Sequence, residues 1–534
     1  MITNGFSNNH VMLIGYENQE NLGLRSIIAY IQKMGYRVHL VPFLSGQEGL
    51  VLDEVKKHQP ILIGFSLIFQ FSIETFSALM RYLRLHHVSA HFTAGGHFPS
   101  LRPAETLELI PELDTIVRFE GEETLLDLLR HLESRTDWLS IKGIAYRDNG
   151  AIIETPLRPF IENLDALPFV YRNGEPKTIG VIPTASILAS RGCHFNCSFC
   201  SIRQFYGSLP GKLRRSRSPE RVAEEMQILF ENKGVRFFSF QDDDFASRSP
   251  VQKTWIRAFL KALREKKLSE RIKWKISCRV DDVETDLLQE MVKHGLFAIY
   301  LGVESGNETG LNTLNKQVSV QKNQDTIALV KDFNLALSIG FMLFDPSSTA
   351  SSVVENINFL EWVGQDGYFP INFCKMLPYA GTPIEQQLRE SGRLTGTITH
   401  PDYEFLTEDI NWYAFLVQRV FMRRNFSDTG VIRLQNTDFE YRLANAFDPE
   451  TITSGEIERL RTLISRSNTL AIQTRRELLE AIETMGAEEF FREENTLLSI
   501  ADREWSGEVE IQEENHRIIS ALWSRRKDIN SALA

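Results

Sequence analysis

Three of the five cysteines in this 534-residue chain lie close together in the stretch SRGCHFNCSFCS (190–201). They are Cys193, Cys197 and Cys200. An odd, clustered set of cysteines argues against a disulfide framework and for thiolates that hold metal. A structural zinc ion would need a fourth ligand, which could come from His194, Cys278 or Cys374. Three thiolates that bind a [4Fe–4S] cluster and leave one iron open fit the pattern better.

The bulk composition is that of a globular protein, with 43% hydrophobic and 24% charged residues and enough length for two to four domains. The longest apolar stretch, ILIGFSLIF (61–69), is about half of the ~20 residues that a membrane-spanning helix needs. The first residues also lack a signal-peptide pattern. We therefore expect a cytoplasmic protein with no membrane span. The net charge of −11 makes nucleic acid an unlikely partner.

Residues 10 to 132 alternate short β-branched runs with amphipathic segments. The expected strands are 10–16, 37–43, 61–68, 91–96 and 115–119, and the expected helices are 21–34, 72–87 and 121–132. This alternation is typical of a parallel, doubly wound, Rossmann-like sheet. A hairpin that turns at Asp148-Asn149-Gly150 follows, and then a proline-bearing connector.

The second region repeats the alternation six times. Its expected strands are 186–192, 237–243, 273–279, 298–305, 336–344 and 371–377. Six units predict a partial (β/α)6 barrel of the TIM type. Polar residues gather at the carboxyl ends of these strands, where parallel α/β folds build their sites. The cysteine stretch lies just beyond the first strand.

Strand signals largely vanish after residue 384, and the remaining segments have the apolar spacing of helices. We therefore expect an α/β chain with four parts. These are a Rossmann-like domain at 1–150, a linker at 151–185, a partial barrel at 186–390 and a helical domain at 391–534.

The motifs of the second region resemble the radical S-adenosylmethionine (SAM) superfamily. Besides the cysteine motif, the chain has FSFQDDDF (238–245), LGVESG (301–306), GFMLFDP (340–346) and PYAGTP (378–383), in the order in which similar enzymes carry them. In that superfamily, SAM chelates the open iron of a [4Fe–4S] cluster. The resemblance covers about residues 186 to 390.

The resemblance implies which residues contact SAM. They are Phe199, Asp242, Asp243, Arg279, Glu304 and Ser305. Glu304 would accept a hydrogen bond from SAM, or else pair with a neighbouring lysine. Asp242 and Asp243 could instead cap a helix, and Arg279 could form an ordinary ion pair. Cys278 and Cys374 are interpreted as buried core thiols.

The N-terminal region resembles the cobalamin-binding domain that precedes the barrel in one large radical SAM class. The resemblance rests on NLGLRSIIAY (21–30), TAGGHFPS (93–100) and FEGEETL (119–125). Cobalamin would bind at the carboxyl edge of the sheet. The implied contacts are Leu22, Gly23, Ser66, Gly95, Gly96, Glu120 and Gly121. An empty crevice, or one that binds another ligand, is the alternative.

One feature departs from cobalamin-binding domains that coordinate cobalt through the histidine of an Asp-x-His-x-x-Gly motif. The chain lacks this motif, and the loop at 17–21 contains no histidine. The lower face of cobalt would then carry water, a weak ligand or nothing. His97 is predicted to be a loop histidine with a backbone partner rather than a metal ligand.

The basic run KLRRSRS (212–218) has three interpretations. The arginines could fasten a loop, hold an anionic substrate or contact RNA. We favour the structural interpretation, because no RNA-binding domain is recognisable.

Together these resemblances imply a cobalamin-dependent radical SAM enzyme. The expected cofactors are a [4Fe–4S] cluster, SAM and cobalamin. The expected activity is methyl transfer to an unactivated carbon or a phosphinate centre of a small or peptidic metabolite, through a 5′-deoxyadenosyl radical and methylcobalamin. The catalytic machinery would be the cluster and its cysteines. The alternatives are a radical cyclisation or rearrangement and, from a different class, a cluster-based sensor. A small-molecule or peptide substrate and an electron donor such as flavodoxin or ferredoxin would be the partners.

Overall fold

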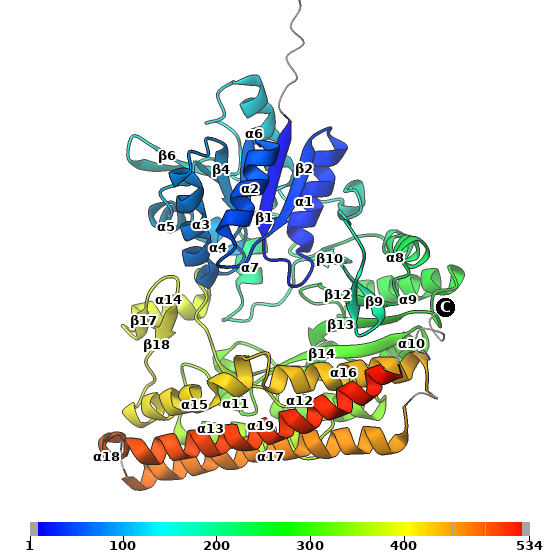
Figure 1. The fold of residues 1–534 in the computed structure, drawn as a ribbon, viewed down its shortest axis with the longest axis vertical. Coiled ribbons are helices and arrows are strands. Elements are labelled where there is room, and N and C mark those ends of the chain that lie inside the picture. Colours follow the sequence, from blue (N-terminus) through cyan, green and yellow to red (C-terminus); the bar gives the residue numbers. More distant parts are fainter. Residues whose placement is uncertain (1–8, 450–451, 486, 526–534) are drawn as a thin grey trace, which may run out of the picture.

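The computed structural model describes residues 9–449, 452–485 and 487–525. Figure 1 shows an N-terminal α/β domain above a curved, open sheet, with long C-terminal helices lying across the lower side.

The N-terminal sheet has seven strands in the order β2-β1-β3-β4-β5-β6-β7. The first five are parallel, and β6 and β7 add an antiparallel hairpin. The strands are β1 (His10–Gly15), β2 (Arg37–Pro42), β3 (Leu62–Ser66), β4 (His91–Gly95), β5 (Thr115–Val117), β6 (Ile144–Asp148) and β7 (Ala151–Glu154). The strand order reverses between β1 and β3, and such a switch point opens a crevice at the carboxyl edge.

Helices cover both faces of this sheet. The helices α1 (Leu22–Lys33) and α6 (Glu122–Ser134) pack with Val11 and Leu13 on one face. The helices α2 (Glu48–His58) and α3 (Ile73–Leu85) pack with Met12 and Ile14 on the other. Alternate residues of a strand point to opposite faces, so both faces of β1 are buried, as the doubly wound class requires.

The sequence predicts the five parallel strands, the hairpin and the helices α1, α3 and α6, but it misses three helices. The missed helices are α2, α4 (His97–Leu101) and α5 (Pro103–Leu109). Pro99 and Pro103 interrupt the helical pattern of the last two. His97, which we expected in a loop, is the first residue of α4.

The second sheet has the order β16-β15-β14-β13-β12-β9-β8. Six of its strands are parallel, and β8 pairs antiparallel with β9. The strands are β8 (Lys177–Ile179), β9 (Ile182–Ile187), β12 (Phe237–Phe240), β13 (Lys273–Arg279), β14 (Leu296–Glu304), β15 (Ala336–Phe344) and β16 (Cys374–Lys375). This open half-barrel is the predicted partial (β/α)6 barrel.

The remaining elements of this region connect and cover the barrel strands. The longer helices are α8 (Pro219–Lys233), α9 (Pro250–Glu265), α10 (Thr285–Lys293), α12 (Val320–Asp332) and α13 (Ala350–Gly364). The shorter elements are β10 (Ser190–Arg191), α7 (Ser201–Gly207), β11 (Arg215–Ser216), α11 (Glu308–Thr313) and α14 (Pro383–Glu390), with 3-10 turns at Gln70–Ser72, Leu164–Ala166 and Val280–Asp282. The range 151–185, predicted as a linker, contains β7 at one end and β8 with the start of β9 at the other.

The C-terminal region is helical, with one correction. The helices are α15 (Glu408–Phe426), α16 (Val431–Phe447), α17 (Ser454–Met485), α18 (Ala487–Arg492) and α19 (Glu494–Ser524). Two short strands, β17 (Leu394–Gly396) and β18 (Pro401–Tyr403), pair where we expected none. Within the described part of the chain, no helix is long and apolar enough to cross a membrane.

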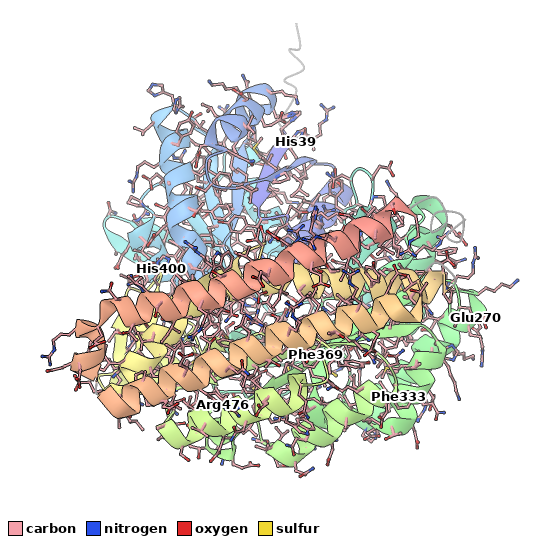
Figure 2. The ribbon with its side chains drawn as sticks, turned by 60° about the horizontal axis from the view of Figure 1, so that its bottom comes forward. His39, Glu270, Phe333, Phe369, His400 and Arg476 are labelled. Atoms are coloured by element: carbon pink, nitrogen blue, oxygen red, sulfur yellow. The ribbon has the colours of Figure 1, made fainter. Side chains whose placement is uncertain are left out.

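The long helices brace the outer layer of the barrel. Arg476 of α17, labelled in Figure 2, forms a 2.6 Å ion pair with Glu361 of α13. Deeper in the layer, the fully buried guanidinium of Arg424 lies 3.7 Å from a carboxylate oxygen of Glu508. A buried charge has to be paired, so this contact fixes how α15 and α19 align.

Several polar contacts join the N-terminal domain to the barrel. Arg191 of β10 lies 2.9 Å from Glu120, which follows β5. The side chain of Gln70 accepts a hydrogen bond from the backbone of Ala380 and donates one to Ile398. Arg102 forms a 2.9 Å ion pair with Glu385 of α14. These contacts hold the carboxyl edge of the N-terminal sheet toward the barrel.

Gly96 provides a test of this packing, because it has a φ of +127° and no room for a side chain. A Cβ at Gly96 would overlap the carbonyl group of Leu67, whereas one at Gly35 (φ +97°) would meet nothing within 4 Å. We expect Gly35→Ala to cost about 1–2 kcal/mol from φ strain alone. Gly96→Ala should cost more, because the steric overlap adds to the strain. Urea unfolding measures the loss of stability in each variant, and hydrogen exchange shows whether β3 and β4 become less protected. Equal losses of stability in the two variants would contradict this explanation.

Candidate functional site

The cysteine loop joins β10 to α7. Gly192 has a φ of +87°, and a Cβ there would overlap the carbonyl oxygen of Leu213. Only glycine fits at this turn, so the sequence forces the chain to bend just before Cys193. The loop is fixed at its other end as well, because the backbone N–H of Ser198 donates to the carbonyl of Leu314, at 3.0 Å.

The three thiols of the loop differ in exposure. Cys197 is buried, and Cys193 and Cys200 are half-buried. Burial raises the pKa of Cys193 and of Cys200 to about 12. Both are therefore thiols in the free protein, and metal binding would have to displace their protons. Three free cysteines on one short loop suit a cluster that needs three thiolates.

A buried arginine supports the loop from β13. Nη1 of Arg279 donates to Sγ of Cys197 at 3.3 Å, and Nε donates to Asp281 at 2.9 Å. Its guanidinium also lies 3.8 Å from the centre of the Phe195 ring and donates to the carbonyl of Lys316. The guanidinium thus places a positive charge beside a candidate cluster ligand. Arg279 thus forms the ion pair that we considered as an alternative, and it also contacts a cluster cysteine.

The carboxylates after β12 hold the backbone that leads to the cysteines. Asp242 is buried and accepts from the N–H of Ala189 at 3.1 Å and from the hydroxyl of Ser190. Asp243 accepts from the N–H of Gly192 at 2.9 Å. Protein atoms around Asp243 raise its pKa to about 6, although its side chain remains accessible. Neither residue caps a helix, so that alternative is wrong.

Glu304 ends β14 in the left-handed region, with a φ of +67°. Its carboxylate lies 3.4 Å from Nζ of Lys316. A Cβ at Gly302 would lie 2.8 Å from Oε1 of Glu304, and one at Gly340 would lie 3.3 Å from Oε2. The two glycines therefore leave space for this carboxylate inside the barrel. A strained backbone at a carboxylate of this kind is typical of a functional site.

Other predicted SAM contacts are placed differently. Ser305 is fully buried, and its hydroxyl lies 3.2 Å from the side-chain oxygen of Asn356. Phe199 is half-buried and packs against the barrel core. Cys278 is a buried core thiol as predicted, but Cys374 is exposed, which corrects our prediction. Cys374 lies on the short strand β16, and its Sγ lies 3.7 Å from the carbonyl oxygen of Phe341.

The carboxyl edge of the N-terminal sheet brings together several predicted cobalamin contacts. The amide of Asn21 donates to the hydroxyl of Ser66 at 3.1 Å and caps α1, which begins with Leu22 and Gly23. A Cβ at Gly15 would lie 3.2 Å from both Asn21 and Ser66. This narrow glycine-lined edge fits close approach of a large ligand.

On the neighbouring strand, Gly95 and Gly96 lie where β4 turns into α4. A Cβ at Gly95 would lie 3.2 Å from the carbonyl oxygen of Val117. His97 is half-buried, and burial lowers its pKa to about 4. Its Nδ1 lies 3.4 Å from the hydroxyl of Ser201, directly after the cysteine loop. His97 thus has a side-chain partner rather than the backbone partner that we expected.

Two predicted cobalamin contacts have other partners. The Glu120 carboxylate accepts from Arg191, Arg215 and the N–H of Ile161. Gly121 packs against α1, where a Cβ would lie 2.9 Å from Cδ1 of Ile27. The structure therefore directs Glu120 into the contact between domains and Gly121 into the packing of α1 within the N-terminal domain.

The edge and the cysteine loop enclose a small cavity. It is lined by Ile68, Phe69, Gln70, His97, Phe98, Leu101, Ser201, Tyr379 and Ala380. These residues come from the N-terminal domain, from the start of α7 and from the segment after β16. The two predicted cofactor regions therefore face each other.

The basic run after the cysteine loop is structural, as we favoured. Arg215 pairs with Glu120 at 2.8 Å, and Arg217 pairs with Glu225 at 2.6 Å. Arg214 donates to the side-chain oxygen of Gln252.

Sequence reasoning missed some residues of the site. Lys316 lies beside Glu304 and has no motif of its own. Asp244 is buried near Cys193 and beside Asp282, and burial raises its pKa well above the usual value. In the sequence, the only sign that Asp244 belongs to the site was its position next to Asp242 and Asp243.

The cysteine loop on a half-barrel and the doubly wound domain above it define a class of protein: a radical SAM enzyme with an N-terminal cofactor-binding domain. Sequence comparisons agree. The Radical SAM superfamily matches residues 187–360, and the B12 binding domain matches residues 15–129. The chain is therefore a radical SAM protein with a B12-binding domain. These domains imply a [4Fe–4S] cluster, SAM and cobalamin as cofactors.

Individual proteins are similar to this chain over much of its length. An uncharacterized methyltransferase of Pyrococcus horikoshii is 29% identical over 366 residues, which cover 67% of this chain and 76% of that protein. The anaerobic magnesium-protoporphyrin IX monomethyl ester cyclase of Cereibacter sphaeroides is 28% identical over 323 residues, 59% of this chain and 50% of that protein. The solved structure of the cobalamin-dependent radical enzyme OxsB with aqua-cobalamin shares the fold, with a TM-score of 0.67 and 17% identity over 98% of this chain and 80% of that one.

We expect the triple replacement of Cys193, Cys197 and Cys200 by alanine to abolish bound iron and the brown colour. The protein should stay folded, because a loop contributes little to the core. Iron analysis of anaerobically reconstituted protein, with circular dichroism, measures both.

The matched controls are Cys278→Ala and Cys374→Ala, which should keep the iron content. Burial of Cys278 means that its replacement should cost about 1 kcal/mol of stability. Full iron content in the triple variant would contradict the assignment of the ligands.

Proposed function

We propose that this protein is a cobalamin-dependent radical SAM methyltransferase. Its substrate would be a small or peptidic metabolite, and the methyl group would be transferred to an unactivated carbon or a phosphinate centre of that metabolite. One observation carries the proposal: the carboxyl edge of the B12-binding domain meets the cysteine loop, with His97 3.4 Å from Ser201. Methyl transfer requires both cofactor regions to reach one substrate, and this arrangement supports that requirement.

When bound, the cluster and SAM supply a 5′-deoxyadenosyl radical, and cobalamin supplies a methyl carrier. Cys193, Cys197 and Cys200 would hold the cluster. The donor Nη1 of Arg279, 3.3 Å from Cys197, stabilises negative charge on that sulfur. Hydrogen bonds to cluster sulfurs help set the reduction potential.

The chain's own residues would orient SAM in the barrel. Glu304 and Asp243 are carboxylates with at least partly accessible side chains near the cysteine loop, and Nζ of Lys316 lies 3.4 Å from Glu304. Phe199 would supply an apolar contact. Asp242 acts on SAM only indirectly, because its oxygens hold Ala189 and Ser190.

On the other side, Leu22, Gly23, Ser66, Gly95 and Gly96 would contact cobalamin. The glycines allow the backbone to approach a bulky ligand, and the hydroxyl of Ser66 offers a polar contact. The aromatic side chains of Phe69 and Tyr379 line the cavity between the two regions and would exclude water from it.

A small substrate and an external reductant are general features of radical SAM enzymes. We propose that flavodoxin or ferredoxin delivers the electron, and that the protein works in the reduced cytoplasm, where three free thiols persist. A radical cyclisation is the second candidate. Its support is the similarity to the Cereibacter cyclase, which matches 59% of this chain.

Anaerobic incubation of the reconstituted protein with methyl-deuterated SAM and candidate metabolites tests this function. We expect 5′-deoxyadenosine together with a product that gains the labelled methyl group, detected by mass spectrometry. The triple cysteine variant should form neither. 5′-deoxyadenosine with an unlabelled, oxidised product would instead support the cyclase candidate.

We expect Ser66→Tyr to weaken the retention of cobalamin, because the larger side chain would occupy the crevice next to Asn21. The measurement is the cobalamin absorbance that remains after desalting of full-length protein loaded with hydroxocobalamin. The wild-type protein should retain about one cobalamin per chain.

The matched control is Ser89→Tyr. Ser89 is exposed just before β4, at the opposite end of the sheet. Equal retention by both variants would place cobalamin elsewhere, and no retention by wild type would remove the main support for methyl transfer.

A further inference from the structure

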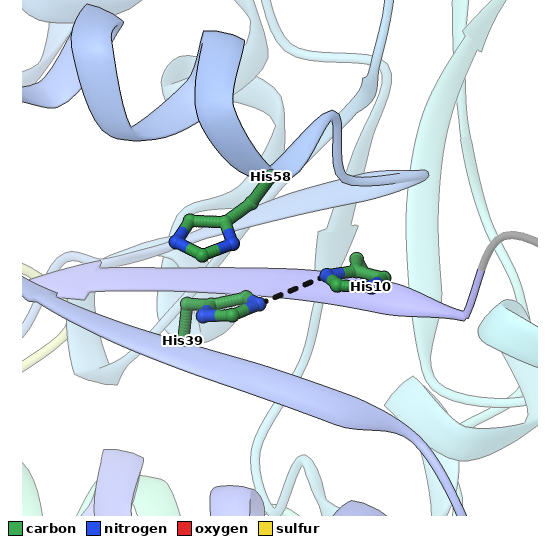
Figure 3. Close-up of side chains that lie close together, drawn as sticks. All are labelled: His10, His39 and His58. Carbon is green, nitrogen blue, oxygen red and sulfur yellow. Dashed lines mark hydrogen bonds between the residues drawn. The ribbon is translucent and has the colours of Figure 1, made fainter.

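Three histidines meet at the end of the N-terminal sheet that lies away from the cofactor crevice (Figure 3). His10 begins β1, His39 lies within β2 and His58 ends α2. Nδ1 of His10 lies 3.0 Å from Nε2 of His39, and the ring centroids of His39 and His58 are 3.6 Å apart. One ring nitrogen of each lies within 4.8 Å of the others.

The fold explains why these side chains converge. Met12 and Ile14 point to the sheet face that α2 covers, and so His10, two residues before Met12, points to the same face. In β2, Val41 packs on this face, so His39 does too. The last turn of α2 then brings His58 over both rings. The three imidazoles thus lie on the same face as the core side chains of β1 and β2, at the edge of the domain where the hydrophobic core ends.

We propose that His10, His39 and His58 form a binding site for a divalent transition-metal ion of the zinc type. Neutral imidazole is a preferred ligand of zinc, copper and nickel, and three histidines with one open position form a recurrent zinc site. Zinc–nitrogen bonds of about 2.0–2.1 Å place tetrahedral ligand nitrogens about 3.3 Å apart. The nitrogens are already close enough for this geometry, but the three rings are stacked, so metal binding would have to turn them until their nitrogens point at one ion.

The electrostatic surroundings are compatible with a bound cation. Burial and the two neighbouring histidines lower the pKa of His39 to about 4, and burial and Arg37 lower that of His10. Glu54 lies 3.2 Å from Nε2 of His58 and supplies a negative charge. Lys57 also pairs with the Glu54 carboxylate at 3.1 Å, and both side chains are exposed, so solvent screens both charges.

The site is separate from the proposed cofactor site. His10 and Gly15 are the two ends of β1, and five residues of extended strand span roughly 17 Å. A metal here would connect β1, β2 and α2, so its effect would be on the stability of the domain. The inference therefore does not depend on the proposed methyl transfer.

Equilibrium dialysis against ZnCl₂ tests the proposal on tag-free, full-length protein with its cluster reconstituted, so that the cysteine loop is occupied. We expect about one zinc per chain and a higher unfolding temperature. X-ray absorption at the zinc edge should show nitrogen or oxygen at about 2.0–2.1 Å and no sulfur at about 2.3 Å.

The variants His39→Gln and His58→Gln should each lose this zinc, and Glu54→Gln should lower the affinity by about 10–100-fold if it orients His58. The matched control is His86→Gln, an exposed histidine at the end of α3, which should bind zinc like wild type. His58→Gln changes only the last residue of a helix, so it keeps the test valid if His39→Gln misfolds. Zinc binding unchanged in His58→Gln, sulfur ligation, or no zinc in wild type would overturn the proposal.

Discussion

A buried ion network between the two α/β parts underlies the geometry of the site. Arg191, directly before Gly192 and the cysteine loop, pairs with Glu120 and Glu122 of the N-terminal domain, and Arg215 pairs with Glu120. Burial raises the pKa of Glu120, but the two guanidinium groups outweigh burial and hold this pKa below its usual value. Removing one partner of a buried pair costs about 3–5 kcal/mol, because the other charge stays unpaired. The position of the cysteine loop under the N-terminal domain therefore depends on these charges.

Within the barrel, space is set by small residues around one strained carboxylate. Glu304 adopts a φ of +67°, which is unfavourable for a residue with a side chain. Its neighbours Gly302 and Gly340 leave room for the carboxylate, and Lys316 provides an opposing charge 3.4 Å away. β14 pairs with β13 and β15 along most of its length, but its register with β15 shifts between Gly302 and Glu304, so the ladder is irregular where the backbone of Glu304 is strained.

The two ends of the N-terminal sheet have different chemistry for a geometric reason. At the carboxyl ends the strand order reverses, so loops diverge and leave a crevice lined by Gly15 and Ser66. At the amino ends, the side chains of His10, His39 and His58 from β1, β2 and α2 converge. The same sheet thus offers a glycine-lined edge for a large organic cofactor and a compact cluster of imidazoles that suits a single ion.

The sequence by itself determined the fold class and the cysteine motif, because both depend on local patterns: strand and helix periodicity, and three thiols on one loop. Only the tertiary structure decided which side chains remain available to ligands. Glu120 matches a cofactor motif but is neutralised by Arg191, Ser305 is buried, and Cys374 is exposed at an edge strand. His10, His39 and His58 form no motif along the chain. They meet because β1 pairs with β2 and α2 packs across both, and such long-range packing cannot be derived from residue spacing.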